Sequence, residues 1–262
     1  MAGHRSGEMS WNPGQENVVS SSAEIRSELA PTGKLRATIN LGNVVLAQRH
    51  GATGALGGVS VDLARELAGR LDVEAELFPF DTAGKALAAL STGQCDVGFL
   101  AMDPVRAAEI DYTGPYVIIE GTYLVPDSSP LRDIDEVDME GIRIAAGKNT
   151  AYDLYLTRAL KHAALVHAPS SRAAIELLFA GQADVAAGVR QPLVAAAAER
   201  AGFHVMSGRF SKIQQAMAIR KGRSPGVLSF LRAFIEEMKG SGFIAGSLLR
   251  SGQGDATIAP PA

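Results

Sequence analysis

Cysteine is nearly absent from this chain, which has one, Cys95, among 262 residues. A single cysteine can form neither an internal disulfide nor a cysteine-based metal cluster. The five histidines lack the HxxxH and HExxH spacings of zinc sites, so we expect no metal. No GxSxG or GxxxxGK[ST] motif occurs, and neither Cys95 nor a histidine has a local catalytic partner. We therefore expect no cofactor and no enzymatic activity.

An excess of charge and a long apolar run are also missing. The 25 basic and 28 acidic side chains leave a formal charge of -3, so we expect no nucleic-acid partner. No stretch reaches the roughly 18 apolar residues of a membrane span, so we expect no membrane insertion. Residues 1–32 are polar, without the apolar run of a secretory signal. The chain is then periplasmic if a signal peptide has been removed, or else cytoplasmic.

After residues 1–32, which we expect to be flexible or briefly helical, alternating strand and helix patterns begin. The predicted strands are 34–41, 73–80 and 97–102, and the predicted helices are 60–71 and 82–90. This alternation indicates an α/β fold with a largely parallel sheet. An extended segment at 116–126, a strand at 212–222, two helices in 224–250 and a loosely held tail at 251–262 complete the prediction.

The same pattern occurs twice. The motif Gly-Gln-x-Asp-Val starts at Gly93 and again at Gly181, 88 residues later, and each copy enters an apolar strand. The elements before the second copy also repeat the earlier order, with a strand at 142–147, a helix at 151–163 and a strand at 164–168. Two similar lobes explain this repeat, with a cleft at the carboxyl ends of their strands.

Arg106 follows the strand at 97–102, which Pro104 ends because proline cannot donate to a sheet ladder. A guanidinium in this place lies where open α/β sheets bind ligands. The alternative is a surface arginine paired with Glu109 or Asp111.

Several segments together resemble type II periplasmic solute-binding proteins of the polar amino-acid ABC transporter family, known as extracellular solute-binding protein family 3. They are GKLRATINLGN, GGVSVDLARELAGRL, GQCDVGFLAMDPVRAAEIDYTGPYV, GIRIAAGKNTAYD and AGQADVAAG. The resemblance implies two lobes, each a mostly parallel sheet flanked by helices, joined by hinge strands near 122–125 and 216–218. Lobe 1 would comprise 33–122 plus 217–262, and lobe 2 would comprise 123–216.

The resemblance also implies how a ligand carboxylate is held. Arg106 matches the family arginine that grips this group, a charge-assisted bidentate pairing. Thr150 and the backbone N–H of Ala151 match the hydroxyl and amide of the second lobe that hold it at a helix N-terminus.

Other matched positions surround the rest of the ligand. Ala101 and Asp103 correspond to the amino-group side of the pocket. Asn40, Asn43 and Thr82 fall where members usually have an acid and aromatic rings.

The chain departs from the family where a lobe 2 aspartate normally neutralises the ligand ammonium. That position falls on Val189 or Arg190. Arg190 would bind a second anionic or polar group of the ligand, or else pair with an acid on the lobe surface. Gln214 is our candidate for a neutral hydrogen bond, although strand alternation leaves one of Gln214 and Gln215 exposed. An amino acid and a carboxylate without an amino group both stay open as ligands.

The resemblance predicts a monomeric solute-binding component of an ABC importer, with a small carboxylate or amino acid as ligand and a permease as partner. Hinge closure would trap the ligand. The alternatives are an enzyme such as a cyclohexadienyl-dehydratase-like lyase, and a cytoplasmic ligand-sensing module.

Overall fold

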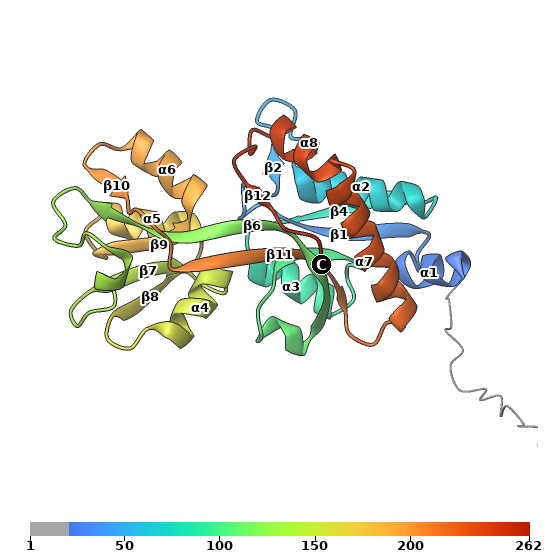
Figure 1. The fold of residues 1–262 in the computed structure, drawn as a ribbon, viewed down its shortest axis with the longest axis horizontal. Coiled ribbons are helices and arrows are strands. Elements are labelled where there is room, and N and C mark those ends of the chain that lie inside the picture. Colours follow the sequence, from blue (N-terminus) through green and yellow to red (C-terminus); the bar gives the residue numbers. More distant parts are fainter. Residues whose placement is uncertain (1–20) are drawn as a thin grey trace, which may run out of the picture.

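The protein has two lobes that lie side by side along its long axis in a computed structural model, which describes residues 21–262 (Figure 1). The prediction for the N-terminal segment 1–32 includes residues 1–20, which lie outside the described residues. Helix α1 occupies Ser22–Leu29, and its N-terminus carries a capping box in which Ser21 and Glu24 accept each other's backbone N–H. Of the two alternatives for this segment, flexible or briefly helical, the part at Ser22–Leu29 is helical.

Lobe 1 contains the first sheet segment and the C-terminal helices. Its elements are β1 (Lys34–Asn40), β2 (Gln48–Arg49), β3 (Leu56–Gly57), α2 (Val59–Arg70), β4 (Glu74–Phe80), α3 (Ala83–Ser91), β5 (Gly98–Ala101), the 3-10 helix η1 (Arg106–Ala108), α7 (Pro225–Gly240), α8 (Phe243–Arg250) and β12 (Thr257–Ile258). Strand β1 pairs in parallel with β4, and Ala37 forms a parallel bridge to Val97, just before β5. The parallel arrangement agrees with the alternating sequence pattern.

Lobe 2 repeats this plan. Its elements are the 3-10 helix η2 (Ile134–Glu136), β7 (Arg143–Gly147), α4 (Ala151–Ala159), β8 (Ala164–Ala168), α5 (Ser171–Phe179), β9 (Val185–Val189), α6 (Arg190–Glu199) and β10 (Phe203–Val205). Strand β7 pairs in parallel with both β8 and β9. The two-lobed α/β fold is therefore as expected.

Two long antiparallel strands, β6 (Ile110–Pro126) and β11 (Ser211–Arg220), pass between the lobes (Figure 1). They join the strands of both lobes in the order β5-β11-β6-β9-β7-β8. The hinge segments expected at 122–125 and 216–218 lie on either side of the crossing, because 122–124 pair with β9 in lobe 2 and 216–218 pair with β5 in lobe 1. Between these segments, residues 119–120 of β6 pair with 212–213 of β11. The lobe boundaries at 122/123 and 216/217 remain a proposal.

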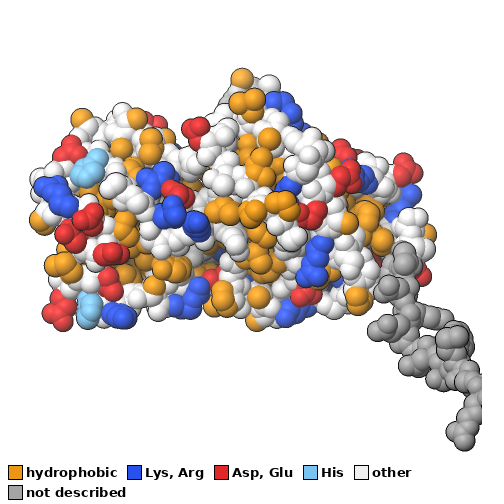
Figure 2. Space-filling model, in the orientation of Figure 1, with side chains coloured by type: hydrophobic (Ala, Val, Ile, Leu, Met, Phe, Trp, Pro, Cys, Tyr) orange, Lys and Arg blue, Asp and Glu red, His pale blue; other side chains and the backbone are white. Residues whose placement is uncertain are grey.

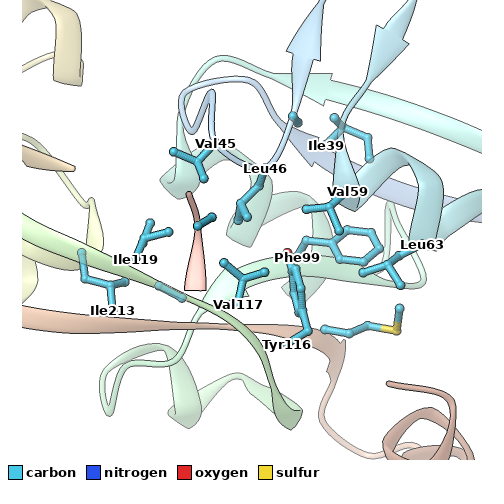
Figure 3. Packing of buried hydrophobic residues seen from close by; sticks show 14 of the residues in the cluster. Ile39, Val45, Leu46, Val59, Leu63, Phe99, Tyr116, Val117, Ile119 and Ile213 are labelled. Carbon is cyan, nitrogen blue, oxygen red and sulfur yellow. The ribbon is translucent and has the colours of Figure 1, made fainter. Parts of the chain in front are cut away.

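Apolar side chains of the crossing strands continue the core of lobe 1. Ile119 and Ile213 lie close together on β6 and β11, and Phe99 packs edge-on against Tyr116 at a centroid distance of 6.3 Å (Figure 3). Tyr116 is fully buried, and its hydroxyl lies 3.3 Å from the Ser60 Oγ. The buried cluster therefore runs through the crossing, and it also includes lobe 2 residues such as Ile144 and Val185.

The C-terminal tail differs from the expectation of a loosely held segment. Strand β12 pairs with β6, and Ala259 N–H donates to the Tyr116 carbonyl at 3.1 Å. Ala259 is buried as a result. The tail is held because backbone groups at the edge of β6 can pair with it. The Gly/Pro-rich sequence of the tail gives no sign of this pairing.

Candidate ligand-binding site

A cavity of about 640 Å³ lies between the lobes. Lobe 1 lines it with the residues after β1, the start of α3 and the end of β5. Lobe 2 lines it with the residues after β7, the end of β9 and the starts of α4, α5 and α6. Both lobes therefore face the cavity with the carboxyl ends of parallel strands, the usual ligand-binding edge of such sheets.

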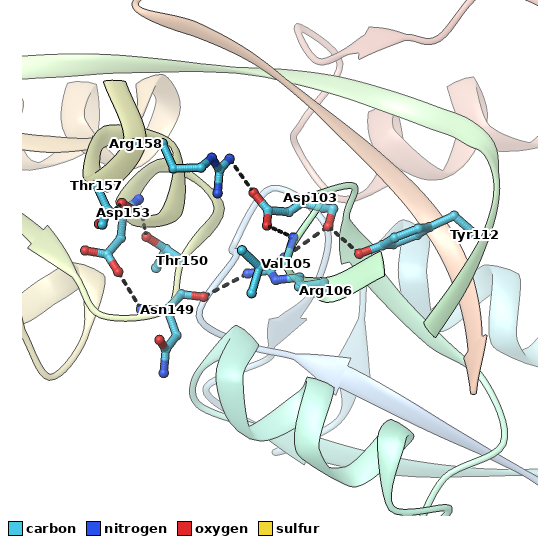
Figure 4. A network of polar contacts seen from close by, with 10 residues as sticks. Asp103, Val105, Arg106, Tyr112, Asn149, Thr150, Asp153, Thr157 and Arg158 are labelled. Atoms are coloured by element: carbon cyan, nitrogen blue, oxygen red, sulfur yellow. Dashed lines mark hydrogen bonds and ion pairs between the residues drawn. The ribbon is translucent and has the colours of Figure 1, made fainter. Parts of the chain in front are cut away.

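Arg106 lies in the wall of this cavity and is only 2% exposed. Its guanidinium donates to the carbonyl of Ala101 in lobe 1 at 3.1 Å and to that of Asn149 in lobe 2 at 2.8 Å (Figure 4). No described carboxylate hydrogen-bonds to it, so the pairing with Glu109 or Asp111 does not form. Desolvation by burial lowers the pKa of Arg106 from its usual value, with weaker opposing effects of Tyr112 and Asp103. The result is a buried, uncompensated cation beside a cavity.

Thr150 and Ala151 lie opposite, at the start of α4. The Thr150 hydroxyl caps this helix by accepting the N–H of Asp153 at 3.2 Å, and it donates to the Gly147 carbonyl at 2.7 Å. Helices α3 and α5 also begin at the cavity, capped by Thr82 and Ser170. Free N–H groups and the dipole at helix N-termini favour an anion, which adds to the field of Arg106.

Four further predicted residues also line the cavity, namely Ala101, Asn40, Asn43 and Thr82. Asn40 Oδ1 accepts the N–H of Gly42 at 3.1 Å. Asn43 Oδ1 is buried and has no hydrogen-bond partner among the described residues.

Asp103 does not line the cavity, although it is only 6% exposed. Its carboxylate accepts the N–H of Val105 at 2.8 Å and a guanidinium N–H of Arg158, from α4 of lobe 2, at 2.7 Å (Figure 4). The carboxylate is thus already neutralised by an arginine across the cleft.

Arg190 also points away from the cavity. It pairs with Glu120 on β6 at 2.9 Å and donates to the carbonyls of Met206 and Gly208. Arg209 binds the other oxygen of Glu120 at 2.8 Å. Basic and acidic side chains gather on this face, near the entry of the crossing strands into lobe 2 (Figure 2). Of the two alternatives for Arg190, the structure therefore shows the pairing with an acid.

Gln214 is exposed, whereas its neighbour Gln215 is 4% exposed and lines the cavity. Strand alternation had left one of them exposed, and our choice of Gln214 was wrong. The inward face of β11 is fixed by its pairing with β5, where Gln215 lies opposite Ala101. That register depends on tertiary structure, so the sequence pattern did not reveal it.

The sequence did not indicate the apolar part of the wall. It comes from α5, α6 and the crossing strands, through Ile119, Ile175, Phe179, Leu193 and Ile213. Helix α6 was not predicted, since its AAAAE sequence carries little amphipathic pattern. Among the described residues, no group of three or more metal-ligating side chains occurs, and no helix is long and apolar enough to cross a membrane.

Comparisons with known proteins agree with this architecture. Over 129 residues the chain is 28% identical to the Virulence sensor protein BvgS of Bordetella pertussis, a match that covers 49% of this chain but only 10% of BvgS. The chain therefore spans about a tenth of the length of this relative.

Two solved structures share the fold. A mutant of ArgBP from T. maritima superimposes with a TM-score of 0.73 at 22% identity, over 86% of this chain and 98% of ArgBP. The ancestral amino acid-binding protein AncCDT-1, a precursor of cyclohexadienyl dehydratase, gives 0.71 at 23% identity, over 86% of this chain and 97% of its own. Finally, the sequence profile of the bacterial extracellular solute-binding proteins, family 3, matches residues 47–248, and the chain belongs to this family.

Proposed function

We propose that this chain is the solute-binding component of an ABC importer and holds a small carboxylate, an amino acid or related organic acid, between its lobes. The observation that carries the proposal is the buried guanidinium of Arg106, which lines the cavity without a carboxylate partner. A desolvated charge without a counter-ion is costly, and an anionic ligand would remove that cost. The site therefore favours a carboxylate over a neutral solute.

The geometry also explains how binding would favour closure. A guanidinium has five N–H donors, and two of those of Arg106 reach carbonyls, one on each lobe. The remaining donors and the N-terminus of α4, with Thr150 and Ala151, can hold one carboxylate from both sides. A ligand that contacts both lobes stabilises the closed form by its differential affinity for that form. A monomer in the periplasm with a permease as partner fits this function.

A binding role fits the cavity better than catalysis. The acids in its wall are Asp81, Glu176 and Glu199, all exposed, and Asp81 is paired with Lys85 at 2.8 Å. A general acid with a raised pKa needs a buried carboxyl beside the substrate. The wall offers no such group among the described residues.

A ligand-sensing module is the second candidate, because half of the chain matches BvgS, a sensor protein. The same cavity would then report ligand binding to an attached signalling part. Co-purification with a permease favours the first candidate, and genetic linkage to a signalling domain favours the second.

The test is a thermal-shift screen of amino acids and organic acids against the wild type, Arg106→Ala and Arg132→Ala. A ligand that binds only the native state raises the melting temperature. We expect Arg106→Ala to weaken binding about a hundredfold or more, as the loss of a charge-assisted pair is worth about 3 kcal/mol. Arg132 is exposed and outside the cavity, so its variant should bind normally.

Circular dichroism checks that the variants are folded. Arg106→Lys keeps the charge but loses the planar guanidinium that can bind a carboxylate with two N–H groups, so it should also bind weakly. Equal affinity of the wild type and Arg106→Ala would contradict the proposed site.

A further inference from the structure

The cavity wall lacks a partner for an ammonium group near Arg106. Asp103 is bound by Arg158 and lies outside the wall, and Glu120 is bound by Arg190 and Arg209. Asp153, beneath the start of α4, is 3% exposed and also lies outside the wall. Each of these three acids around the cleft is therefore already engaged or lies outside the cavity wall.

The acids that do line the cavity are exposed to solvent. Glu176 on α5 and Glu199 on α6 lie on lobe 2, and Asp81 pairs with Lys85 on lobe 1. The buried polar groups of the wall are neutral or basic, with Gln215 and Arg106 as the most enclosed. An α-ammonium held beside the carboxylate would be desolvated next to a guanidinium and without a counter-ion.

Another part of the wall is apolar. Helices α5 and α6, the end of β9 and the crossing strands β6 and β11 contribute hydrophobic side chains to it: Ile119, Ile175, Phe179, Val189, Leu193 and Ile213. Ile175, Leu193, Ile119 and Ile213 are all at most 9% exposed. At about 640 Å³ the cavity has room for a ring or a branched chain beyond the carboxylate.

We propose that this cavity selects a monocarboxylate with an apolar body and no ammonium group. The inference rests on the proposed function, since it assumes that Arg106 holds the carboxylate. It goes further in assigning the two remaining parts of the ligand: the apolar body lies against α5 and α6, and the carbon next to the carboxylate carries no cation.

Matched ligand sets test this assignment. Isothermal titration calorimetry of the wild type would compare 3-phenylpropionate with L-phenylalanine, and 4-methylpentanoate with L-leucine. Phenethylamine has the ammonium and ring but no carboxylate, and succinate is a polar acid without an apolar body. We expect at least one deaminated acid to bind about tenfold or more tightly than its amino acid, and neither phenethylamine nor succinate to compete with it.

A second test supplies the missing acid. Val189 lines the cavity as the last residue of β9 and precedes α6, a position where aspartate is a favoured helix cap, so Val189→Asp should fold. We expect Val189→Asp to shift the preference toward the amino acid by about tenfold. Val189→Asn has the same shape and no charge, so a shift in preference that Val189→Asp shows and Val189→Asn does not is due to the added carboxylate.

The outcomes separate the two proposals. If the amino acid binds as tightly as its deaminated counterpart in both pairs, or succinate binds more tightly than the apolar acids, the inference is wrong while an Arg106-dependent carboxylate site stands. If no acid in the set binds, or Arg106→Ala leaves all affinities unchanged, both proposals fail. An unshifted preference in a folded Val189→Asp, as judged by circular dichroism, also contradicts the inference.

Discussion

Arg106 is held in place by backbone carbonyls, and one of these belongs to a residue in a left-handed conformation. Asn149 has φ of 61°, a region that asparagine tolerates better than most residues. Its N–H donates to Asp153 Oδ2 at 2.8 Å, and its carbonyl accepts from Arg106. Asp153 Oδ1 lies 2.7 Å from His167 Nδ1. Asp153 therefore positions the loop that contacts the binding arginine.

Asp153→Asn should disturb this loop, because an amide replaces one acceptor oxygen with a donor. The amide can keep the Asn149 N–H only by turning its NH2 group to His167 Nδ1, which must then accept, and this rearrangement costs about 1–3 kcal/mol in unfolding free energy. We expect about a tenfold loss of affinity for the acid that the wild type binds, measured by calorimetry. Asp255→Asn, at an exposed residue, is the matched control. Normal affinity in a destabilised Asp153→Asn would mean that the loop does not position Arg106.

At the scale of elements, the repeated motif has a structural explanation. Asp96 accepts the backbone N–H of Arg36 and two guanidinium N–H groups, at 2.7–3.1 Å. Asp184 forms the same three bonds with Arg143, at 2.8–3.0 Å. In each lobe the acid before one strand therefore fastens the arginine near the start of its parallel neighbour. The sequence repeat revealed the acids but not their partners.

These two acids should differ in their contribution to stability. The Asp96 side chain is fully buried, whereas that of Asp184 is 37% exposed. Removing one partner of a buried pair costs about 3 kcal/mol or more, while an exposed pair contributes about 1 kcal/mol or less. Urea unfolding should therefore show a much larger loss for Asp96→Asn than for Asp184→Asn. Equal losses would contradict the importance of burial here.

Glu120 fastens the crossing strand β6 to two arginines and should make stability depend on pH. Burial raises the pKa of Glu120, but hydrogen bonds from Arg190 and Arg209 outweigh this and hold it below its usual value. Because the pKa of Glu120 is lower in the folded than in the unfolded state, its ion pairs stabilise the fold at pH values above the unfolded pKa of about 4.3. This stabilisation is lost as the pH falls through the folded pKa. The side chain is 36% exposed, so the contribution should be about 1 kcal/mol or less.

Glu120→Gln removes this titrating group. Urea unfolding from pH 7 to pH 3 should show the wild type more stable than the variant at pH 7, with the difference shrinking toward pH 3. The other acids titrate in both proteins and cancel in the comparison. A difference that stays constant with pH would show that the carboxylate charge does not matter.

At the scale of the whole molecule, the lobes touch across the cleft. The Asp103–Arg158 ion pair, at 2.7 Å, joins lobe 1 to the last turn of lobe 2 helix α4, and the Arg106–Asn149 bond, at 2.8 Å, joins it to the loop before this helix (Figure 4). The N-terminal turn of α3 also approaches Asn149, since a Cβ on Gly84 would lie 3.3 Å from the Asn149 Cβ. These contacts favour a closed arrangement.

Arg158→Ala should shift the free protein toward an open arrangement. The Arg158 side chain is 43% exposed, so its pair is worth about 1 kcal/mol or less, equivalent to at most about a fivefold change in the open-to-closed ratio. Small-angle X-ray scattering without ligand should give a larger radius of gyration than for the wild type or Arg132→Ala. An unchanged radius would mean that this ion pair does not hold the lobes together.

The sequence by itself determined the order of elements, the two similar lobes and the position of Arg106 beyond β5. These features depend on local periodicity, on a repeated motif and on the strand break at Pro104, all of which are read within a few residues. Where the periodicity is weak the sequence did not predict the structure, as for helix α6 and for the strand pairing of the tail.

Only the tertiary structure decided where the polar side chains of the candidate site point. Asp103 and Arg190 turn to partners far away in the chain, Arg158 and Glu120, and the register of β11 turns Gln215 rather than Gln214 inward. The physical reason is that a charge or amide adopts the orientation in which burial and hydrogen bonding are satisfied together, and its partners come from segments that only the folded chain brings near.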